Sequence, residues 1–356
     1  MSSDRPSPLD VEDLYARVNK SLDEFVTRQQ MVLAGISDDL DPVIFAARAM
    51  LGGGKRLRPA FAYWGWRAAG GLDGEEIVSA VTSLELLQAC ALIHDDVMDG
   101  SDTRRGQPSV HRRFAADHLA QEWLGSADTF GMGAAILLGD LALVWADEML
   151  FASGVPDAAL QRAKLTYDRM RTELMAGQYL DLLEQARGGG SVDRAMQVAR
   201  YKSAKYTVEG PLHLGADLAD GDAELLSVLS AYGLPLGEAF QLRDDLLGVF
   251  GDPEQTGKPA GDDLREGKRT VLIALTVESA TPSQVLVIDN ALGDPELTLE
   301  GVNTLRNVIV ETGARDLVEH LISERAAQAC AALANIDEPA RQVLADLAHA
   351  ATSRQD

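Results

Sequence analysis

Two acidic clusters in this chain have residue types and a spacing that suit metal binding. Asp95, Asp96 and Asp99 form a DDxxD pattern, and Asp244 and Asp245 form a second pair about 150 residues later. Residues four apart lie on one face of a helix, so Asp95 and Asp99 project together, with Asp96 at the flank. Mg²⁺ prefers carboxylate oxygens and is often held by a few carboxylates plus substrate phosphates. Two facing clusters could therefore hold several Mg²⁺ ions around a diphosphate.

The segment before the first cluster favours a site over a solvated surface. With 55 acidic residues in the chain, a single DDxxD pattern could also be an exposed acidic face. However, residues 84–93 read LELLQACALI, which is too apolar for an exposed helix and predicts a buried one. Carboxylates at the end of a buried helix need partners or a metal ion.

Cations accompany both acidic clusters, and the first three follow a glycine run at residues 52–54. In chain order they are Lys55, Arg56, Arg58, Arg104, Arg105, Lys202, Lys258 and Lys268. Arginine can bind phosphate oxygens through two parallel hydrogen bonds, and lysine acts as a point charge. Metal ions and these cations would attract an anionic substrate to a chain whose net charge is −23.

Composition limits the class of protein. The chain has 356 residues, of which 46% are hydrophobic and 5% aromatic, and its abundant Ala and Leu favour helices. Its net charge of −23 argues against nucleic acid or an anionic membrane as a partner. Cys90 and Cys330 lie in apolar helical patterns, so we interpret them as buried thiols of a reducing compartment. Residues 1–10 lack the apolar core of a signal peptide, and no apolar stretch approaches the ~20 residues that span a bilayer. We expect a soluble, cytoplasmic protein without a transmembrane segment.

Apolar residues recur at three- and four-residue intervals along almost the whole chain, which predicts helices and no strands. The expected helices cover residues 11–31, 43–50, 57–69, 75–98, 133–151, 158–185, 192–216, 223–250 and 270–279, with shorter ones up to residue 350. We expect residues 11–352 to fold as a single all-α domain, a large helical bundle around a central cavity. Residues 1–10 are expected to be mobile.

The motifs together resemble the trans-isoprenyl diphosphate synthase family, also called polyprenyl synthetases. The resemblance runs from about residue 45 to residue 275. It rests on GGGKRLRP from residue 52, HDDVMDGSDTRRG from residue 94, LLGD from residue 137, GQYLD from residue 177, FQLRDDLLGVFGD from residue 240 and GKPAGDDLREGKRT from residue 257.

The resemblance implies an all-α homodimer that condenses an allylic diphosphate with isopentenyl diphosphate, using three Mg²⁺ ions. It places the metal ligands at Asp95, Asp96, Asp99, Asp244 and Asp245. It places the allylic diphosphate at Arg104, Lys202 and Lys258, the isopentenyl diphosphate at Lys55, Arg58, Gln88 and Arg105, and a further substrate contact at Lys268. The catalytic candidates are Lys202 and Lys258, whose charges would stabilise the leaving diphosphate, and Ser203 and Gln241, whose oxygens would face the allylic carbocation.

Product length is expected to depend on the helix that carries Asp95. The growing chain would run back along it, past Ala91, Cys90, Leu87 and Leu84. Relatives that stop at farnesyl diphosphate usually close this path with an aromatic residue four or five positions before the first aspartate. Here both positions are small, which favours geranylgeranyl diphosphate, with farnesyl or longer products as alternatives. Ordinary close helix packing would also explain small residues there.

One position departs from the family pattern. The second acidic motif commonly reads DDxxD, whereas this chain has Gly248 at the third acidic position and its next acid is Asp252. Either the third carboxylate is dispensable, or Asp252 replaces it from beyond the turn at Gly251.

Two other functions compete with a synthase. A terpene cyclase shares the metal-dependent ionisation, but it has no use for the second diphosphate site at Lys55, Arg58 and Arg105. A non-catalytic subunit of a heteromeric synthase would explain the missing aspartate. Catalytic decay usually removes several ligands, however, and here five carboxylates and the expected cations remain.

Overall fold

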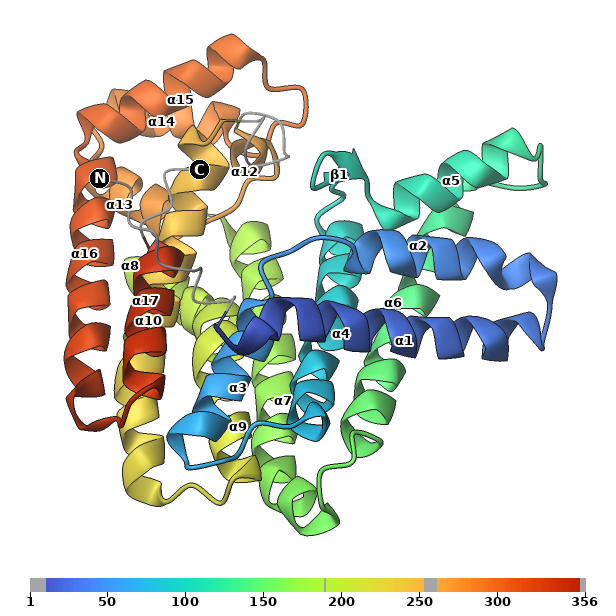
Figure 1. Ribbon diagram of the computed structural model, residues 1–356. Helices are drawn as coiled ribbons and strands as arrows, with labels where there is room; N and C mark the ends of the chain where they lie inside the picture. The colour runs from blue at the N-terminus through green and yellow to red at the C-terminus, as the bar shows by residue number, and fades with distance from the viewer. Residues whose placement is uncertain (1–10, 189, 253–260, 353–356) are drawn as a thin grey trace, which may run out of the picture.

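A computed structural model describes residues 11–188, 190–252 and 261–352 (Figure 1). The helices are α1 (Leu14–Ala34), α2 (Asp41–Leu51), α3 (Leu57–Ala68), α4 (Glu75–Met98), α5 (Val110–Ala120), α6 (Ala127–Phe151), α7 (Asp157–Arg187), α8 (Val192–Val198), the π-helix η3 (Ala199–Glu209), α9 (Gly210–Leu218), α10 (Ala223–Phe250), α12 (Asp262–Arg265), α13 (Val271–Ser279), α14 (Pro282–Ala291), α15 (Leu299–Glu311), α16 (Ala314–Ala332) and α17 (Ala340–Thr352). Short 3₁₀ turns, η1 (Val11–Asp13), η2 (Asp38–Leu40) and η4 (Leu333–Asn335), complete them. The predicted all-α bundle is confirmed.

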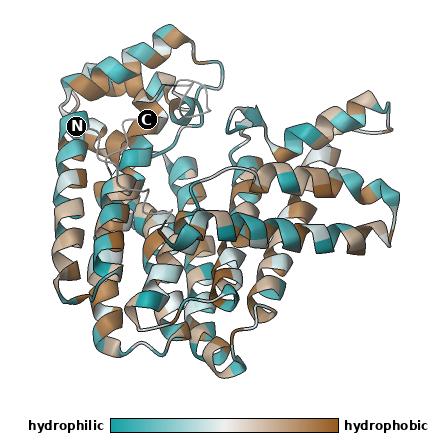
Figure 2. Ribbon diagram, in the orientation of Figure 1, coloured by the Kyte–Doolittle hydropathy of each residue, from teal (hydrophilic) through white to brown (hydrophobic). Residues whose placement is uncertain are grey.

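The long helices α4, α6, α7 and α10 run through the body of the bundle, and α1 and α2 lie across it (Figure 1). The central helix α4 buries apolar residues on every side, among them Val81, Leu84 and Leu87. The outer helix α1 is amphipathic and buries one stripe, which includes Val18, Leu22 and Phe25 (Figure 2). The core therefore forms around α4, and the crossing helices cover it.

Two helices correct the expectation that no segment has the length and apolar character of a membrane span. By length and hydropathy alone, α4 and α6 both resemble membrane spans, because their few polar residues scarcely lower the mean hydropathy of each helix. The span-like window of α4 is 72% buried, as in a core helix of a bundle, but that of α6 is only 39% buried. An apolar face of α6 is thus exposed in the single chain.

Three local features were not predicted from the sequence. The first is helix α5, and the second is the two-stranded hairpin before it, in which β1 (Thr103–Arg104) pairs antiparallel with β2 (Gln107–Pro108). The third is a π-helix. The predicted helix over residues 192–216 is continuous, but its middle part is the π-helix η3. Such wider turns are rare and occur frequently at functional sites, and η3 carries Lys202 and Ser203.

The two cysteines differ in environment. Cys90 on α4 is fully buried, and burial, with a smaller contribution from Asp140, raises the pKa of its thiol to about 12. Cys330 on α16 is exposed, so the prediction that it is buried is wrong. The apolar residues around it, such as Ala329 and Leu333, face inwards, while Cys330 lies on the outer face of the same helix.

Candidate active site

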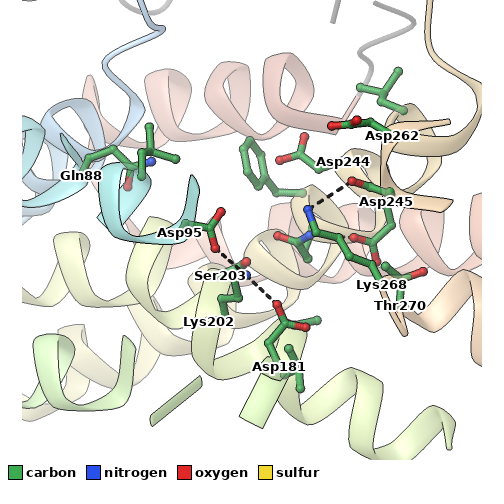
Figure 3. Close-up of a pocket in the computed structure, with 18 of the residues that line it drawn as sticks. Gln88, Asp95, Asp181, Lys202, Ser203, Asp244, Asp245, Asp262, Lys268 and Thr270 are labelled. Atoms are coloured by element: carbon green, nitrogen blue, oxygen red, sulfur yellow. Dashed lines mark hydrogen bonds and ion pairs between the residues drawn. The ribbon is translucent and has the colours of Figure 1, made fainter. Parts of the chain in front are cut away.

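A cavity of about 570 Å³ opens between the end of α4, the π-helix η3 and the end of α10 (Figure 3). Helix α4 contributes Glu85, Gln88, Leu92 and Asp95, which recur every three or four residues and therefore share one helix face. The cavity is also lined by the glycine-rich segment before α3, the hairpin arginines Arg104 and Arg105, Asp181 on α7, residues of α8 and the segment from α12 to Thr270. The cavity thus collects motifs from widely separated parts of the chain.

The β hairpin separates two neighbouring arginines. Its turn residues, Arg105 and Gly106, both have positive φ angles, of 53° and 71°, as tight hairpin turns require. Arg104 folds back onto Asp96, to which its Nε donates a 3.0 Å hydrogen bond. Arg105 Nη1 instead donates 2.9 Å to the carbonyl of Gly52. One arginine therefore joins the first acidic motif, and the next joins the glycine-rich segment.

Asp95 is the centre of a polar network. Its Oδ1 accepts hydrogen bonds of 3.0 Å from both Gln178 Nε2 and Lys202 Nζ. Lys202 Nζ also lies 2.7 Å from Asp181 Oδ2, so Lys202 bridges Asp95 and Asp181 (Figure 3). Burial raises the pKa of Asp95, but the charges of Lys202, Lys268 and Arg104 outweigh it and hold that pKa at about 2. Asp95 is therefore ionised at neutral pH.

Close packing of α7 against η3 makes this network possible. A Cβ atom on Gly177 would lie 2.3 Å from the backbone nitrogen of Lys202, so only glycine permits this approach. Gln178 and Asp181 follow on the same helix, where Gln178 donates to Asp95 and Asp181 lines the cavity. The role of the GQYLD motif at residues 177–181 could not be predicted from the sequence alone.

Asp99 lies in a different environment. Its side chain is only 1% exposed, and Lys268 Nζ lies 3.6 Å from its Oδ2. Neither of its carboxylate oxygens accepts a hydrogen bond. Burial and the charge of Asp95 together raise the pKa of Asp99 to about 6. A buried carboxylate of this kind would be stabilised by a cation.

The second acidic motif lies at the end of α10, where Asp244 and Asp245 line the cavity. Asp245 Oδ1 accepts a 2.7 Å hydrogen bond from Gln241 Nε2. Burial raises the pKa of Asp245 to about 8, although this hydrogen bond opposes the shift and the charges of Asp263 and Asp244 add to it. The negative charge at this motif is therefore only partly compensated by the nearby cations.

A second group of cations surrounds the glycine-rich segment. Arg58 Nη2 donates 2.7 Å to Thr207 Oγ1, and its guanidinium lies 4.5 Å from the centre of the Tyr206 ring. Arg58 Nε and Gln88 Oε1 are buried without a hydrogen-bond partner. Burial and the charges of neighbouring arginines lower the pKa of Arg105. These groups form a preorganised site for an anion, some distance along the cavity from the aspartates.

A buried ion pair that was not predicted from the sequence fixes the glycine-rich segment. Arg56 has a positive φ of 52°, is 5% exposed, and donates to Glu85 Oε2, Leu51 O and Asn19 Oδ1. Arg56 therefore holds the segment in place. The available signal was Glu85 itself, a single carboxylate within the apolar run of α4, because a buried carboxylate must be paired.

The structure brings most of the predicted site residues together. Those that line the cavity are Lys55, Arg58, Gln88, Asp95, Arg104, Arg105, Lys202, Ser203, Gln241, Asp244, Asp245 and Lys268. Those that do not are Asp96, Asp99, Cys90, Ala91, Leu87 and Leu84. Asp96 is fully buried beneath Arg104, and Lys258 lies outside the described residues.

The donor set fits Mg²⁺ in chemistry. Among the described residues, no three His, Cys, Asp or Glu side chains are arranged as a ready metal site. The reason is visible in the ion pairs, because Lys202 and Lys268 lie against Asp95 and Asp99. The two acidic motifs offer carboxylate oxygens, and both oxygens of Asp99 lack a hydrogen bond. Such oxygens suit a hard cation, which would displace the lysine ammonium groups.

Comparison with known proteins agrees with this geometry. Residues 45–309 match the family model described as polyprenyl synthetase. A geranylgeranyl diphosphate synthase of Mycobacterium tuberculosis is 33% identical over 79% of this chain and 75% of its own length. A geranylfarnesyl diphosphate synthase of Aeropyrum pernix is 30% identical over 82% of this chain and 87% of its own.

A solved structure is also very similar. The geranylgeranyl pyrophosphate synthase from Corynebacterium glutamicum, complexed with isoprenyl diphosphate and magnesium, superposes with a TM-score of 0.94. It is 43% identical, and the match covers 98% of this chain and 100% of that one.

The fold and the site define an all-α enzyme that acts on diphosphates. The chain belongs to the polyprenyl synthetase family and is a prenyltransferase. The family resemblance seen in the sequence is confirmed.

Proposed function

We propose that this protein is a Mg²⁺-dependent synthase that condenses isopentenyl diphosphate with an allylic diphosphate and releases geranylgeranyl diphosphate. The observation that carries the proposal is the presence of two cationic groups in one cavity. Arg104, Lys202 and Lys268 accompany the aspartates, whereas Lys55, Arg58 and Arg105 surround the glycine-rich segment. Two diphosphates can therefore bind at once, one beside metal ions and one without them.

The allylic diphosphate belongs beside the acidic motifs. Asp95, Asp99, Asp244 and Asp245 would hold Mg²⁺, and we propose three ions, which when bound neutralise the charge of the departing diphosphate. Lys202 and Lys268 lie among these carboxylates and supply further positive charge for the diphosphate. Burial lowers the pKa of Lys202, but the charges of Asp95 and Asp181 have the larger effect and raise the pKa overall. The ammonium group therefore stays charged.

The condensation needs oxygen atoms beside the cation and an acceptor for one proton. The bond between C1 and the diphosphate oxygen breaks, the isopentenyl double bond attacks C1, and a proton then leaves to the released diphosphate. Ser203 and Gln241 line the cavity and can stabilise the positive charge. Gln241 Nε2 donates a hydrogen bond to Asp245, so the side-chain carbonyl oxygen of Gln241 is the atom suited to stabilise the carbocation.

The second diphosphate site favours a synthase over a terpene cyclase. A cyclase ionises an allylic diphosphate and needs no second substrate. Here Arg58 is fixed by Thr207 and Tyr206, and Arg105 is fixed by backbone carbonyls. Such preorganised cations support binding of isopentenyl diphosphate.

Small side chains on α4 support a product of twenty carbons. Cys90 and Ala91 precede Asp95 by five and four positions, and neither would block a growing chain. The similar synthases of M. tuberculosis and C. glutamicum make geranylgeranyl diphosphate, according to their names, and that of A. pernix makes the longer geranylfarnesyl diphosphate. Longer products are the main alternative.

A homodimer is supported by the exposed face of α6. Phe130, Leu137, Val144 and Phe151 are 40%, 69%, 61% and 44% exposed. They are spaced seven residues apart, which is the repeat with which one helix packs along another. We propose that α6 of one subunit packs against its partner there.

We also propose that residues 11–352 form one domain. The buried apolar residues form two clusters, but α10 and α16 contribute to both, which ties the clusters together. A cytoplasmic location fits the two free cysteines.

The test is to incubate the purified chain with farnesyl diphosphate, radiolabelled isopentenyl diphosphate and Mg²⁺, and to extract the products. A synthase places the label in a twenty-carbon diphosphate, and chelation of Mg²⁺ reversibly abolishes this. A cyclase gives an unlabelled hydrocarbon or alcohol. A non-catalytic subunit gives neither product, and either of these last two results would refute the proposal.

A further inference from the structure

Glu238 is a buried carboxylate on α10 that has no part in the reaction steps proposed above. Its side chain is only 4% exposed. A buried carboxylate has to be paired, and two arginines from different helices pair with this one. Arg200 of η3 contacts one of its oxygens, and Arg325 of α16 contacts the other. Glu238 therefore joins three helices through one carboxylate.

The contact with Arg200 is the stronger of the two. Nε and Nη2 of Arg200 donate hydrogen bonds of 2.9 and 2.7 Å to Glu238 Oε1. Arg325 Nε lies 3.1 Å from Glu238 Oε2 but makes no hydrogen bond there. Hydrogen bonds between charged groups are stronger than those between neutral groups. Glu238 therefore holds η3 more firmly than it holds α16.

Both members of this ion pair lie three residues before a group that reaches the cavity. Ser203 follows Arg200 on η3, and Gln241 follows Glu238 on α10. Residues three apart are neighbours on a helix surface. Ser203 and Gln241 line the cavity, whereas Arg200 and Glu238 do not. The ion pair thus lies within one helical turn of the two oxygens that are proposed to face the carbocation.

Close packing holds the second half of η3 against α10. A Cβ atom on Gly237 would lie 2.5 Å from Ala204 Cα, so the two backbones touch there. The Arg200–Glu238 pair extends this contact to the first half of η3, which carries Ser203. Glu238 therefore fixes the part of the π-helix that lines the cavity.

We propose that Glu238 is a positioning residue for the condensation. Through Arg200 it holds the first half of η3 against α10, and so it sets the distance between the Ser203 hydroxyl and the Gln241 carbonyl oxygen. Groups that stabilise a developing charge act best when they are already in place before the reaction. The inference rests on the proposed synthase function and adds to it a residue outside the cavity.

Steady-state kinetics with farnesyl diphosphate, isopentenyl diphosphate and Mg²⁺ tests this role. Arg200→Gln and Glu238→Gln should each lower kcat at least about tenfold, because a displacement of about 1 Å can cost about a hundredfold in rate. Both KM values should stay within about twofold of the wild type, as expected when binding of the substrates is unchanged. Lys202, which would bind the allylic diphosphate, is held separately by Asp95 and Asp181. Arg200→Lys keeps the charge and should lose less activity than Arg200→Gln.

Arg325→Gln is the matched control. It removes the other arginine from the same carboxylate and leaves the contact with η3 intact. Its kcat should stay near the wild-type value, even if its melting temperature falls as far as that of Arg200→Gln. The double variant Arg200→Gln with Glu238→Gln should lose no more activity than Glu238→Gln alone, because both changes break one contact.

Circular dichroism and melting temperatures show whether each variant folds. Arg200 is 47% exposed, so its replacement leaves no buried cavity, and this variant keeps the test decisive even if Glu238→Gln does not fold. A kcat near the wild-type value in Arg200→Gln overturns the inference. An equal loss of kcat in Arg325→Gln also overturns it, because Glu238 would then act only through stability. If the wild type incorporates no isopentenyl diphosphate, the proposed function fails instead.

Discussion

Lys202 Nζ lies 3.0 Å from Asp95 Oδ1, so the first acidic motif already holds a cation before any metal ion binds. The lysine keeps the aspartate ionised, and the aspartate keeps the lysine charged. Both groups are therefore ready for a diphosphate and its metal ions, because neither has to change its protonation state.

Replacing Asp95 with Ala should lower kcat by about a thousandfold or more while the protein stays folded. In the wild type this carboxylate would hold a cation at the ionising diphosphate. A thousandfold loss of rate corresponds to about 4 kcal/mol of transition-state stabilisation. Steady-state kinetics and melting temperatures measure the two effects. Activity within tenfold of the wild type would contradict the assigned role of Asp95.

Replacing Asn19 with Ala should raise the KM for isopentenyl diphosphate about tenfold and leave the KM for the allylic substrate unchanged. Asn19 Oδ1 accepts two hydrogen bonds from Arg56, at 3.0 and 2.9 Å, and Arg56 holds the segment that carries Lys55. A hydrogen bond to a charged group contributes about 1.5 kcal/mol or more. Lys20→Ala, at an exposed neighbour on α1, is the control. Equal increases in both KM values would mean a general loss of structure.

The path of the growing chain can be tested on α4. Cys90→Phe should shift the products towards farnesyl diphosphate, and Leu87→Ala should shift them towards longer chains. Both side chains are fully buried, and Leu87 lies one turn further from Asp95 than Ala91 does. Chromatography of the hydrolysed products gives the distribution. If neither variant changes it, the residues that limit chain length lie on another helix.

Leu137→Glu should disrupt the dimer that we propose. Leu137 is 69% exposed in the middle of the apolar stripe of α6, and a carboxylate there would have to be desolvated at a helix interface. Light scattering after size-exclusion chromatography should show a dimer for the wild type and a monomer for the variant. Leu286→Glu, at a residue 63% exposed on α14, is the control and should remain dimeric. A monomeric wild type would contradict the proposal.

The parts of the site that the sequence predicted are those with a local signature. The spacing of Asp95 and Asp99 within an apolar helix indicates both the helix and the metal chemistry, and family motifs indicate the cations. Contacts between distant segments carry no such signature. Asn19 meets Arg56 across 37 positions, and Arg200 meets Glu238 across 38 only because η3 lies against α10. Hairpin β1–β2 is too short for an alternating pattern, and the outer face that exposes Cys330 depends on which side of α16 meets α10.

The most direct test of the central claim is the ratio of isopentenyl diphosphate incorporated to diphosphate released, with farnesyl diphosphate as the primer and Mg²⁺ present. If both substrates bind in the one cavity and react there, the ratio is one, and the first product has twenty carbons. Release of diphosphate without incorporation of isopentenyl units would show that the second cationic site is not a substrate site, and it would contradict the account.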